Sequence, residues 1–279
     1  MRHPLLQKIY NYWRTTRYVA QIANFFISRE NAFRTWEKNC IDKCIMASGC
    51  KRVDETYILK GSLFSEMLWP NAYALGSEFA PKVLGTYEME IAPIINNWMA
   101  KYPITSIINI GASEGHYAVG LARRLPGIPV YAYEIQEVAH PKIAALATLN
   151  NVGEQIKVKS EFSNGELLLN KFGALPFFLI DIDGGEDSLC DEVFARNTKH
   201  CLLLIEIHDC YISGIGKRLL HRFASTHALS VIRYSPNARR KAIRPKGISQ
   251  SEWMRATDER RPATGNYWIV MVPKNHYSV

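Results

Sequence analysis

The segment IINIGASEGHYAVGLARRLPGIPVYAYEI, residues 107–135, decides the fold. It contains an apolar strand, a turn with glycines, a helix, a second apolar strand and a closing acid. In an open α/β sheet this order places Gly111 and Gly115 at the carboxyl edge of the first strand, where backbone can approach a ligand closely. Glu134 ends the next strand, where a carboxylate can accept hydrogen bonds from both hydroxyls of a ribose. The segment therefore predicts a pocket for a cofactor that contains a nucleoside.

The turn itself distinguishes between nucleoside cofactors. A dinucleotide site needs three glycines as G-x-G-x-x-G, and the second of these admits a pyrophosphate. Here the turn reads Gly111-Ala112-Ser113-Glu114-Gly115, so the second glycine is absent. Glu114 would repel a diphosphate, whereas a cofactor with an amino-acid head and a sulfonium tolerates negative charge nearby. The pattern favours S-adenosylmethionine over NAD. The alternative to any cofactor site is that the turn has no ligand, since turns of this kind also occur in sheets that bind nothing.

The segment resembles motif I of the class I S-adenosylmethionine-dependent methyltransferases, and Glu134 stands where that family has its ribose-binding acid. The resemblance implies S-adenosylmethionine as cofactor and S-adenosylhomocysteine as product. The residues assigned to the cofactor are Gly111, Ala112, Ser113, Glu114, Gly115, Tyr117, Glu134, Ile135, Glu161 and Asp181. Glu161 or its neighbour Phe162, after the third expected strand, would lie near the adenine ring.

From residue 104 onwards, strand and helix patterns alternate with short loops between them. This predicts an α/β fold with a Rossmann-like, seven-stranded, mostly parallel sheet and helices on both faces. The expected strands are 106–110, 130–134, 156–159, 177–181, 201–207, 230–233 and 267–272, and the expected helices are 117–125, 141–150, 189–197 and 217–228. In the methyltransferase fold the last strand runs antiparallel beside the sixth, so residues 234–266 would leave and return at the edge that carries Gly111.

The chain divides into two expected parts. Residues 1–60 form a mainly helical N-terminal extension, and residues 61–279 form the methyltransferase domain with a basic insertion at 235–266. One apolar face of a basic amphipathic helix would carry Leu5, Ile9, Trp13, Ile22 and Phe26. Docking of this helix on the core or on a partner chain is the favoured interpretation, and peripheral membrane contact is the alternative.

The net charge of +8 is unevenly distributed. Residues 1–34 hold six Lys and Arg against one acid, residues 235–261 hold eight against three, and the remainder has a net charge of −2. Basic patches of this kind are usually solvated surface, but an anionic substrate, a nucleic acid or an acidic membrane would also select them. If the insertion overhangs the pocket, Arg239, Arg240, Lys241, Arg244 and Lys246 contact the substrate.

Cysteine spacing and hydropathy bear on the compartment. The six cysteines, at 40, 44, 50, 190, 201 and 210, follow no paired metal-ligand spacing, and a zinc site at the first three lacks a fourth ligand. No run of about 18 apolar residues and no signal peptide is present. We therefore expect reduced thiols and a cytoplasmic protein.

Acids and a histidine close two further strands. The segment FFLIDIDGGED places Asp181 and Asp183 at the carboxyl edge, and LLLIEIHD does the same for Glu206 and His208. An apolar strand does not end on these residues by propensity. Both segments resemble the D-x-E-G-x-E and E-x-H segments of FkbM-type O-methyltransferases, with Asp183 where that family tends to have Glu. The likeness covers about residues 60–273 and implies no particular substrate.

Methyl transfer to oxygen requires removal of a proton, and His208 is the candidate base because an imidazole titrates near ~6.5. Asp183 or Glu206 would orient it, and these three are the catalytic candidates; Asp181 would contact the methionine amine. A structural role for His208 is the alternative. Mg²⁺ held by Asp181, Asp183, Glu206 and Asp209 is a further possibility, although the spacing does not demand it and no metal is assigned.

The expected function is S-adenosylmethionine-dependent O-methylation of a small anionic or polyhydroxylated acceptor or a glycan precursor. Methylation of RNA or another nucleic acid is the alternative within the same chemistry, supported by the pI near 9.1. A non-catalytic protein that binds cofactor and recruits a partner is the alternative of another class. The oligomeric state does not follow from the sequence.

Overall fold

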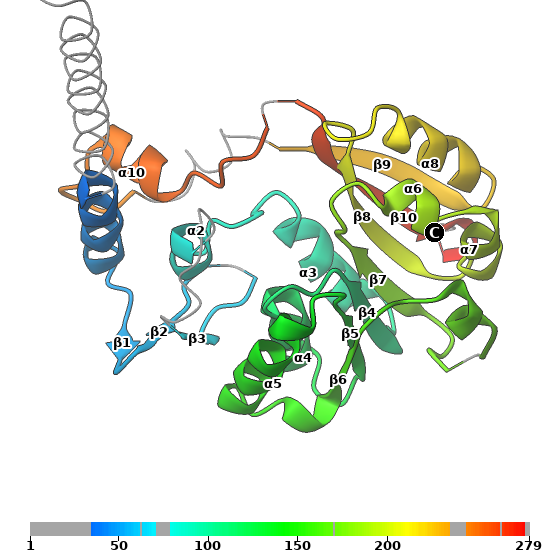
Figure 1. Cartoon of the computed structure of the whole chain (residues 1–279), viewed down its shortest axis with the longest axis horizontal. Helices are drawn as coiled ribbons and strands as arrows, with labels where there is room; N and C mark the ends of the chain where they lie inside the picture. Colours follow the sequence, from blue (N-terminus) through cyan, green and yellow to red (C-terminus); the bar gives the residue numbers. More distant parts are fainter. Residues whose placement is uncertain are drawn as a thin grey trace, which may run out of the picture.

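A seven-stranded sheet forms the centre of the computed structural model, which describes residues 35–61, 63–70, 79–169, 171–234, 244–262 and 264–276. Its strands lie in the order β6-β5-β4-β7-β8-β10-β9. Their bounds are β4 Ser106–Ile110, β5 Val130–Tyr133, β6 Ile156–Lys159, β7 Pro176–Ile180, β8 Leu202–His208, β9 His227–Arg233 and β10 Asn266–Pro273. The predicted mostly parallel α/β sheet is confirmed, with all seven strands within a few residues of their expected positions (Figure 1).

The strand β10 is the one reversed strand of this sheet. It lies between β8 and β9 and is antiparallel to both, with Asn266 opposite His208 and Tyr267 opposite Arg233. Because β9 ends where β10 begins, the intervening segment leaves and returns at the carboxyl edge of the parallel strands, as expected. The residues directly before β10 therefore lie at the edge of the sheet that carries Gly111.

Alternation along the strands separates two apolar layers. Ile107, Phe177 and Leu204 face the layer under α3, α4 and α5, and Ile108 and Phe178 face the layer under α7 and α8. The helix bounds are α2 Phe79–Leu84, α3 Ala92–Lys101, α4 His116–Arg124, α5 His140–Leu149, α6 Glu186–Leu189, α7 Glu192–Asn197, α8 Ile215–Phe223 and α10 Gln250–Ala256. Short 3-10 turns are η2 Glu137–Ala139, η3 Gly153–Gln155, η4 Asn164–Leu169 and η5 Lys274–His276. Helices on both faces confirm the doubly covered sheet.

Two expected helices were wrong in detail. The helix expected at 189–197 is divided, because Asp191 lies in extended conformation and its carboxylate caps a new helix by accepting from the Phe194 amide at 2.8 Å. The helix expected at 217–228 ends at Phe223, and His227 already belongs to β9. The buried His227 ring contacts the Cys201 carbonyl oxygen at 3.1 Å, a tertiary contact that hydrophobic spacing does not reveal.

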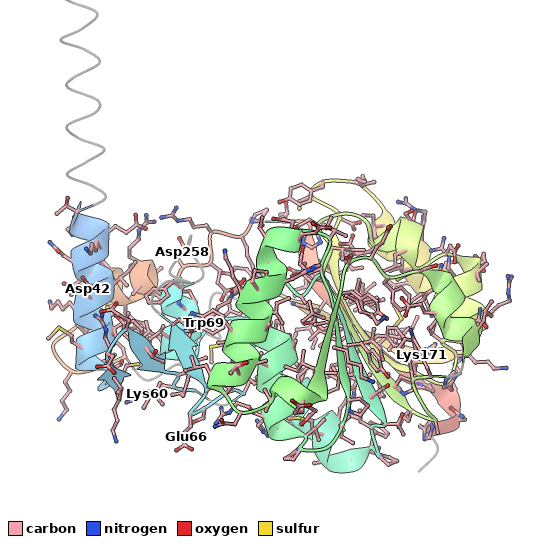
Figure 2. The ribbon with its side chains drawn as sticks, turned by 60° about the horizontal axis from the view of Figure 1, so that its bottom comes forward. Asp42, Lys60, Glu66, Trp69, Lys171 and Asp258 are labelled. Carbon is pink, nitrogen blue, oxygen red and sulfur yellow. The ribbon has the colours of Figure 1, made fainter. Side chains whose placement is uncertain are left out.

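The N-terminal part contains more than helix. After a helix over 35–47, three short antiparallel strands form a second sheet, β1 Arg52–Val53, β2 Thr56–Ile58 and β3 Leu68–Pro70. This sheet crosses position 60, and Trp69 of β3, labelled in Figure 2, belongs to the same apolar cluster as α4 and α5. The domain boundary at 60 stays a prediction. The apolar positions from Leu5 to Phe26 lie outside the described residues.

The described part of the basic insertion packs against the N-terminal helix. Trp253 and Ala256 of α10 share an apolar cluster with Cys44, and Lys43 contacts Glu252 at 2.8 Å. Figure 1 shows α10 beside the N-terminal helix, at the end of the molecule away from α7 and α8. Within the described part of the chain, no helix combines the length and the apolar content needed to cross a membrane.

Asn150, which directly follows α5, connects that helix to β3 of the second sheet and offers a test of this arrangement. Its side chain accepts from the Leu68 amide at 2.8 Å and donates to the Leu68 carbonyl at 2.9 Å. Asn150→Ala leaves both backbone groups without these bonds, so we expect a loss of about 1–3 kcal/mol in the free energy of unfolding, measured by urea titration. The exposed Asn97 is the matched control, and Asn97→Ala should change stability by less than about 0.5 kcal/mol. Equal effects of the two variants would contradict the connection.

Candidate active site

The turn after β4 brings three strands together without room for a side chain. Gly111 has φ +81°, and a Cβ placed there would lie 1.7 Å from the carbonyl oxygen of Asp181. The amides of Gly111 and Ala112 both donate to the Tyr133 carbonyl at 2.9 Å. Gly115, at φ +96°, then begins α4. The chain ends of β4, β5 and β7 therefore meet at one point of the carboxyl edge, as the glycine pattern predicted.

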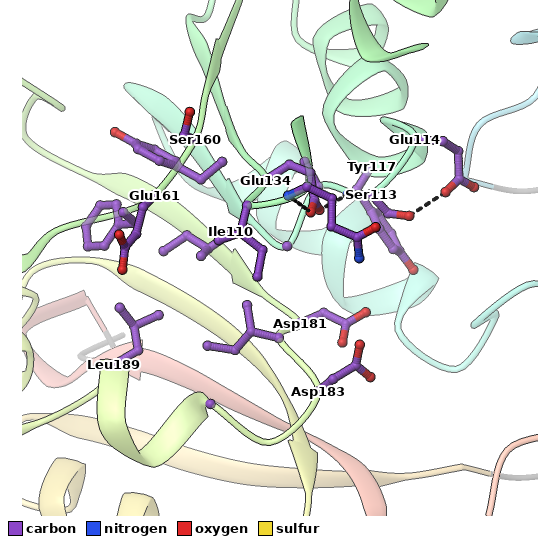
Figure 3. A pocket seen from close by; sticks show the side chains of 18 of the residues that line it. Ile110, Ser113, Glu114, Tyr117, Glu134, Ser160, Glu161, Asp181, Asp183 and Leu189 are labelled. Atoms are coloured by element: carbon purple, nitrogen blue, oxygen red, sulfur yellow. Dashed lines mark hydrogen bonds between the residues drawn. The ribbon is translucent and has the colours of Figure 1, made fainter. Parts of the chain in front are cut away.

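A cavity of about 670 Å³ opens at this edge (Figure 3). Nine of the ten residues assigned to the cofactor line it, and Gly115 lies just behind the lining at the start of α4. Asp183 also lines the cavity, whereas Glu206 and His208 lie behind Asp181 and Asp183. The structure thus gathers the predicted residues around one space of a size that small-molecule sites commonly have.

Glu134 is fixed by the backbone around it. Its carboxylate accepts from the amides of Ser113 and Gln136, both at 2.8 Å, and the side chain is buried except for its face toward the cavity. Charge-assisted bonds of this kind hold a carboxylate in one orientation. The remaining lone pairs are available to two hydroxyls of a ligand at the end of β5.

Glu114 carries a fixed negative charge at the turn. The Lys82 ammonium, from α2, binds it, and the Ser113 hydroxyl donates to it at 2.6 Å. Burial raises the pKa of Glu114, but Lys82 and Ser113 outweigh burial and hold it at about 2. Lys82 also lies over the Tyr87 ring, 4.6 Å from its centroid. No motif in the sequence points to Lys82, which precedes the turn by about thirty residues.

The far end of the cavity is apolar on one side. Phe162 is buried against Tyr133, with 5.0 Å between ring centroids, and Leu189 lies opposite in Figure 3. Glu161 is exposed at the rim. Of the two residues that the sequence offered for the adenine side, Phe162 therefore forms the wall and Glu161 lies at its border.

His208, the last residue of β8, is buried, and its two ring nitrogens face different carboxylates. Its Nδ1 lies 2.7 Å from Oε1 of Glu186, and its Nε2 lies 3.7 Å from Asp181 and 3.6 Å from Asp183. The residue at hydrogen-bond distance of the ring is therefore Glu186, and not Asp183 or Glu206 as the sequence suggested. Glu186 was visible in the DIDGGED segment as an acid directly after a Gly-Gly turn.

Glu206 instead belongs to a buried cluster around Arg261. The guanidinium binds Glu206 and Glu88 and contacts Glu259 at 2.8 Å, while the Tyr117 hydroxyl donates to Glu88. All three carboxylates are almost fully buried. Burial, together with the neighbouring Asp181 and Glu88 carboxylates, raises the pKa of Glu206 well above its usual range. The protonated form of Glu206 is therefore favoured although Arg261 lies beside it.

Asp181 responds to the same excess of negative charge. Burial and the neighbouring Glu88 carboxylate raise the pKa of Asp181 to about 7, although His208 opposes this shift. Burial of the ring lowers the pKa of His208, but the hydrogen bond to Glu186 and the nearby Asp181 raise it above its ordinary value. The site therefore contains a carboxyl group whose pKa is about 7 beside a histidine whose pKa lies above its ordinary value, and acid–base chemistry uses groups with shifted pKa values of this kind.

Among the described residues, the four acids considered for Mg²⁺ do not gather as one group. The Asp209 carboxylate accepts from the Gly216 amide at 3.1 Å and from the Tyr267 hydroxyl at 2.8 Å. These bonds hold the loop after β8, so we do not assign Asp209 to a cation. Among the described residues, Asp181, Glu206 and His208 each place one ligand atom within 4.8 Å of the others. Glu206 is already bound by Arg261, and we assign no metal to this group.

The basic insertion contributes to the site through Arg261. Arg239, Arg240 and Lys241 lie outside the described residues, and Arg244 donates to the Ile248 carbonyl instead of facing the cavity. Arg260 binds Glu37 of the N-terminal helix. The residues that line the cavity include no member of the described segment 244–262, so its expected overhang is absent from that segment.

Comparison with known proteins assigns no family to the chain. No family profile and no curated protein matches the chain. Among solved structures, it is similar to the O-methyltransferase TomG of Streptomyces achromogenes in complex with SAM, at 11% identity and a TM-score of 0.48 over 72% of this chain and 88% of that one. It is also similar to cofactor-bound Rv0187 from MTB, at 13% identity and a TM-score of 0.46 over 70% of this chain and 85% of that one. An rRNA methylase from Streptococcus thermophilus is similar at 13% identity and a TM-score of 0.42 over 66% of this chain and 96% of that one. TM-scores below 0.5 at 11–13% identity assign neither a fold nor a function to this chain, so its chemistry rests on its own residues.

Gly111→Ala tests the close approach of the strands. The added methyl would collide with the Asp181 carbonyl, so we expect a loss of more than about 3 kcal/mol in the free energy of unfolding by urea titration. Gly127→Ala is the matched control, because Gly127 has φ +80° but no neighbour within 4 Å of the added atom. This variant should lose only about 1–2 kcal/mol in the free energy of unfolding, because alanine is disfavoured in the left-handed conformation. Similar losses in both variants would contradict the steric role.

The pair of Lys82 and Glu114 predicts a pH dependence. Because folding lowers the pKa of Glu114 to about 2, its contribution to stability is present above the unfolded value of ~4.3 and disappears as the pH falls toward 2. Lys82→Met should therefore cost about 2 kcal/mol at pH 7, and the difference from wild type should shrink on acidification. Lys43→Met removes an exposed pair with Glu252 and should lower stability less than Lys82→Met does. A Lys82→Met difference that is constant from pH 7 to pH 3 would contradict this assignment.

Proposed function

We propose that this protein is an S-adenosylmethionine-dependent methyltransferase. The observation that carries the proposal is the position of Glu134, which ends β5 beside the Gly111 turn with its carboxylate turned to the cavity. A carboxylate there accepts from both hydroxyls of a ribose. The apolar wall at Phe162 suits the adenine, and Asp181 at the opposite end suits the methionine amine.

The charge at the turn favours a sulfonium cofactor over a dinucleotide. Glu114 stays ionised because its pKa is about 2, and it occupies the region where a pyrophosphate would bind. Its negative charge is compatible with a cationic sulfonium and an ammonium group. We expect the methionine carboxylate near Lys82, the cation in the cavity lining.

Oxygen is the acceptor atom that the site suits best. A hydroxyl must lose its proton during transfer, and His208 lies near the end of β8 with one ring nitrogen toward Asp181 and Asp183. These residues would remove the proton and hold the hydroxyl near the methyl group. The resemblance of DIDGGE and EIH to FkbM-type O-methyltransferases supports the same chemistry.

We favour a polyhydroxylated acceptor, including a glycan precursor, over an anionic one. The described residues at the mouth of the cavity are acidic, since the Asp183 side chain is 84% exposed and Asp181 lies beside it. The nearby Arg261 is already paired with buried carboxylates. The same acidity disfavours RNA, although the strongly basic ends of the chain fall mainly outside the described residues. A non-catalytic role is disfavoured by the proton-exchanging groups at the mouth. We retain the cytoplasmic placement inferred from the cysteines.

Calorimetry on the full chain tests the proposal. We expect micromolar binding of S-adenosylhomocysteine and none of NADH. Glu134→Gln should weaken S-adenosylhomocysteine binding at least about tenfold, because the ribose loses a charge-assisted hydrogen bond. Glu137→Gln, an exposed neighbour in η2, is the control and should bind as wild type does. Binding of NADH, or undiminished affinity in Glu134→Gln, would refute the assigned pocket.

A further inference from the structure

Glu186 occupies an unusual position for a carboxylate. It begins α6, is fully buried, and accepts from the Gly184 amide at 2.9 Å and contacts Nδ1 of His208 at 2.7 Å through the same oxygen, Oε1. Its other oxygen has no hydrogen-bond partner among the described residues. No Lys or Arg in the described chain forms an ion pair with it. A buried carboxylate that has no Lys or Arg partner is costly unless another group compensates its charge, and here the group within reach is His208.

The loop before α6 is shaped to place this carboxylate. Asp183 and Gly184 have φ of +51° and +104°, so the chain turns back on itself directly after β7. The turn sends the Asp183 side chain toward the mouth of the cavity, where Figure 3 shows it beside Asp181, and it brings Glu186 to the Nδ1 edge of the His208 ring. One short loop thus supplies carboxylates on opposite sides of the imidazole.

The geometry determines which ring nitrogen carries the proton. A carboxylate oxygen accepts, so Nδ1 of His208 must donate to Glu186, and in the neutral ring Nε2 is then unprotonated. Nε2 lies 3.7 Å from Asp181 and 3.6 Å from Asp183, beyond hydrogen-bond distance. The Tyr211 ring is parallel to the imidazole, with an interplanar angle of 4° and centroids 5.6 Å apart, which limits rotation of the ring.

We propose that Glu186 is the positioning residue that holds His208 with Nδ1 protonated and leaves Nε2 to accept the proton of the hydroxyl acceptor, an inference that rests on the proposed methyl transfer. The acceptor oxygen forms a bond to the methyl carbon, the carbon–sulfur bond breaks, and its electron pair stays on sulfur as the neutral thioether. The hydroxyl proton passes to Nε2. Glu186 stabilises the resulting imidazolium because it lies at hydrogen-bond distance in a buried site.

Four carboxylates surround His208, and the test must separate them. Asp181 and Asp183 face Nε2 from the β7 end, Glu186 faces Nδ1 from α6, and Glu206 lies two residues before His208 on β8 with its carboxyl group bound to Arg261. Only Glu186 is within hydrogen-bond distance of the ring. Removing the charge of Glu186 alone should therefore change the proton equilibrium and the tautomer of His208 more than any other single carboxylate change.

The experiment is a nuclear magnetic resonance titration of the full chain labelled with ¹⁵N-histidine, which reports the tautomer and pKa of His208 without knowledge of the acceptor. In wild type, neutral His208 should carry its proton on Nδ1, and its pKa should lie above the ordinary ~6.5. Glu186→Gln should lower the pKa by about one unit or more, and Glu186→Asp, which keeps the charge, should lower it less. Glu192→Gln removes a nearby exposed carboxylate that binds Arg222 and should leave His208 unchanged.

Three results would overturn the inference. The first is a neutral ring protonated on Nε2 in wild type, the second is an unchanged pKa in folded Glu186→Gln, and the third is a pKa of His208 at or below ~6.5 in wild type. The first and third need no variant, so a Glu186→Gln protein that fails to fold does not remove the test. S-adenosylhomocysteine calorimetry on the same samples separates the two proposals, because absent binding refutes the methyltransferase whatever the tautomer, and binding with an Nε2-protonated ring refutes only the role of Glu186.

Discussion

The close approach of two backbones at Gly111 is the constraint on which the site depends. With no side chain at this position, the end of β4 meets the Asp181 carbonyl at the end of β7, and the same turn bonds to β5 through Tyr133. Three strands that are far apart in sequence therefore finish at one point. Glu134 and Asp181 each end one of these strands, so their spacing across the cavity follows from sheet geometry.

Excess negative charge is the second organising feature. Arg261 satisfies Glu88, Glu206 and Glu259 together, and it reaches them because the reversed strand β10 begins at the carboxyl edge of the sheet. Burial and the neighbouring Glu88 carboxylate together raise the pKa of Asp181 to about 7. The buried, negatively charged surroundings thus give the site a carboxyl group that titrates near neutrality.

Much of the fold was predictable because its signals are local. Apolar runs such as 106–110 and 202–207, each followed by polar residues, mark strands buried on both faces, and their positions were confirmed. The helix errors arose where a tertiary contact overrode spacing, as at Asp191 and His227. The second sheet at 52–70 was missed because its strands have two or three residues each, too few for a period to emerge.

The sequence by itself determined the sheet, the glycine turn and the acids at strand ends, since each depends on residues adjacent along the chain. It also placed Asp181, Asp183, Glu206 and His208 at one edge, because parallel strands end together. Only the tertiary structure decided their partners: Glu186 for His208, Arg261 for Glu206 and Lys82 for Glu114. Such pairings depend on how loops fold back and which side chains meet in space, and no periodicity along the chain encodes a contact between residues separated by a loop or by half the protein.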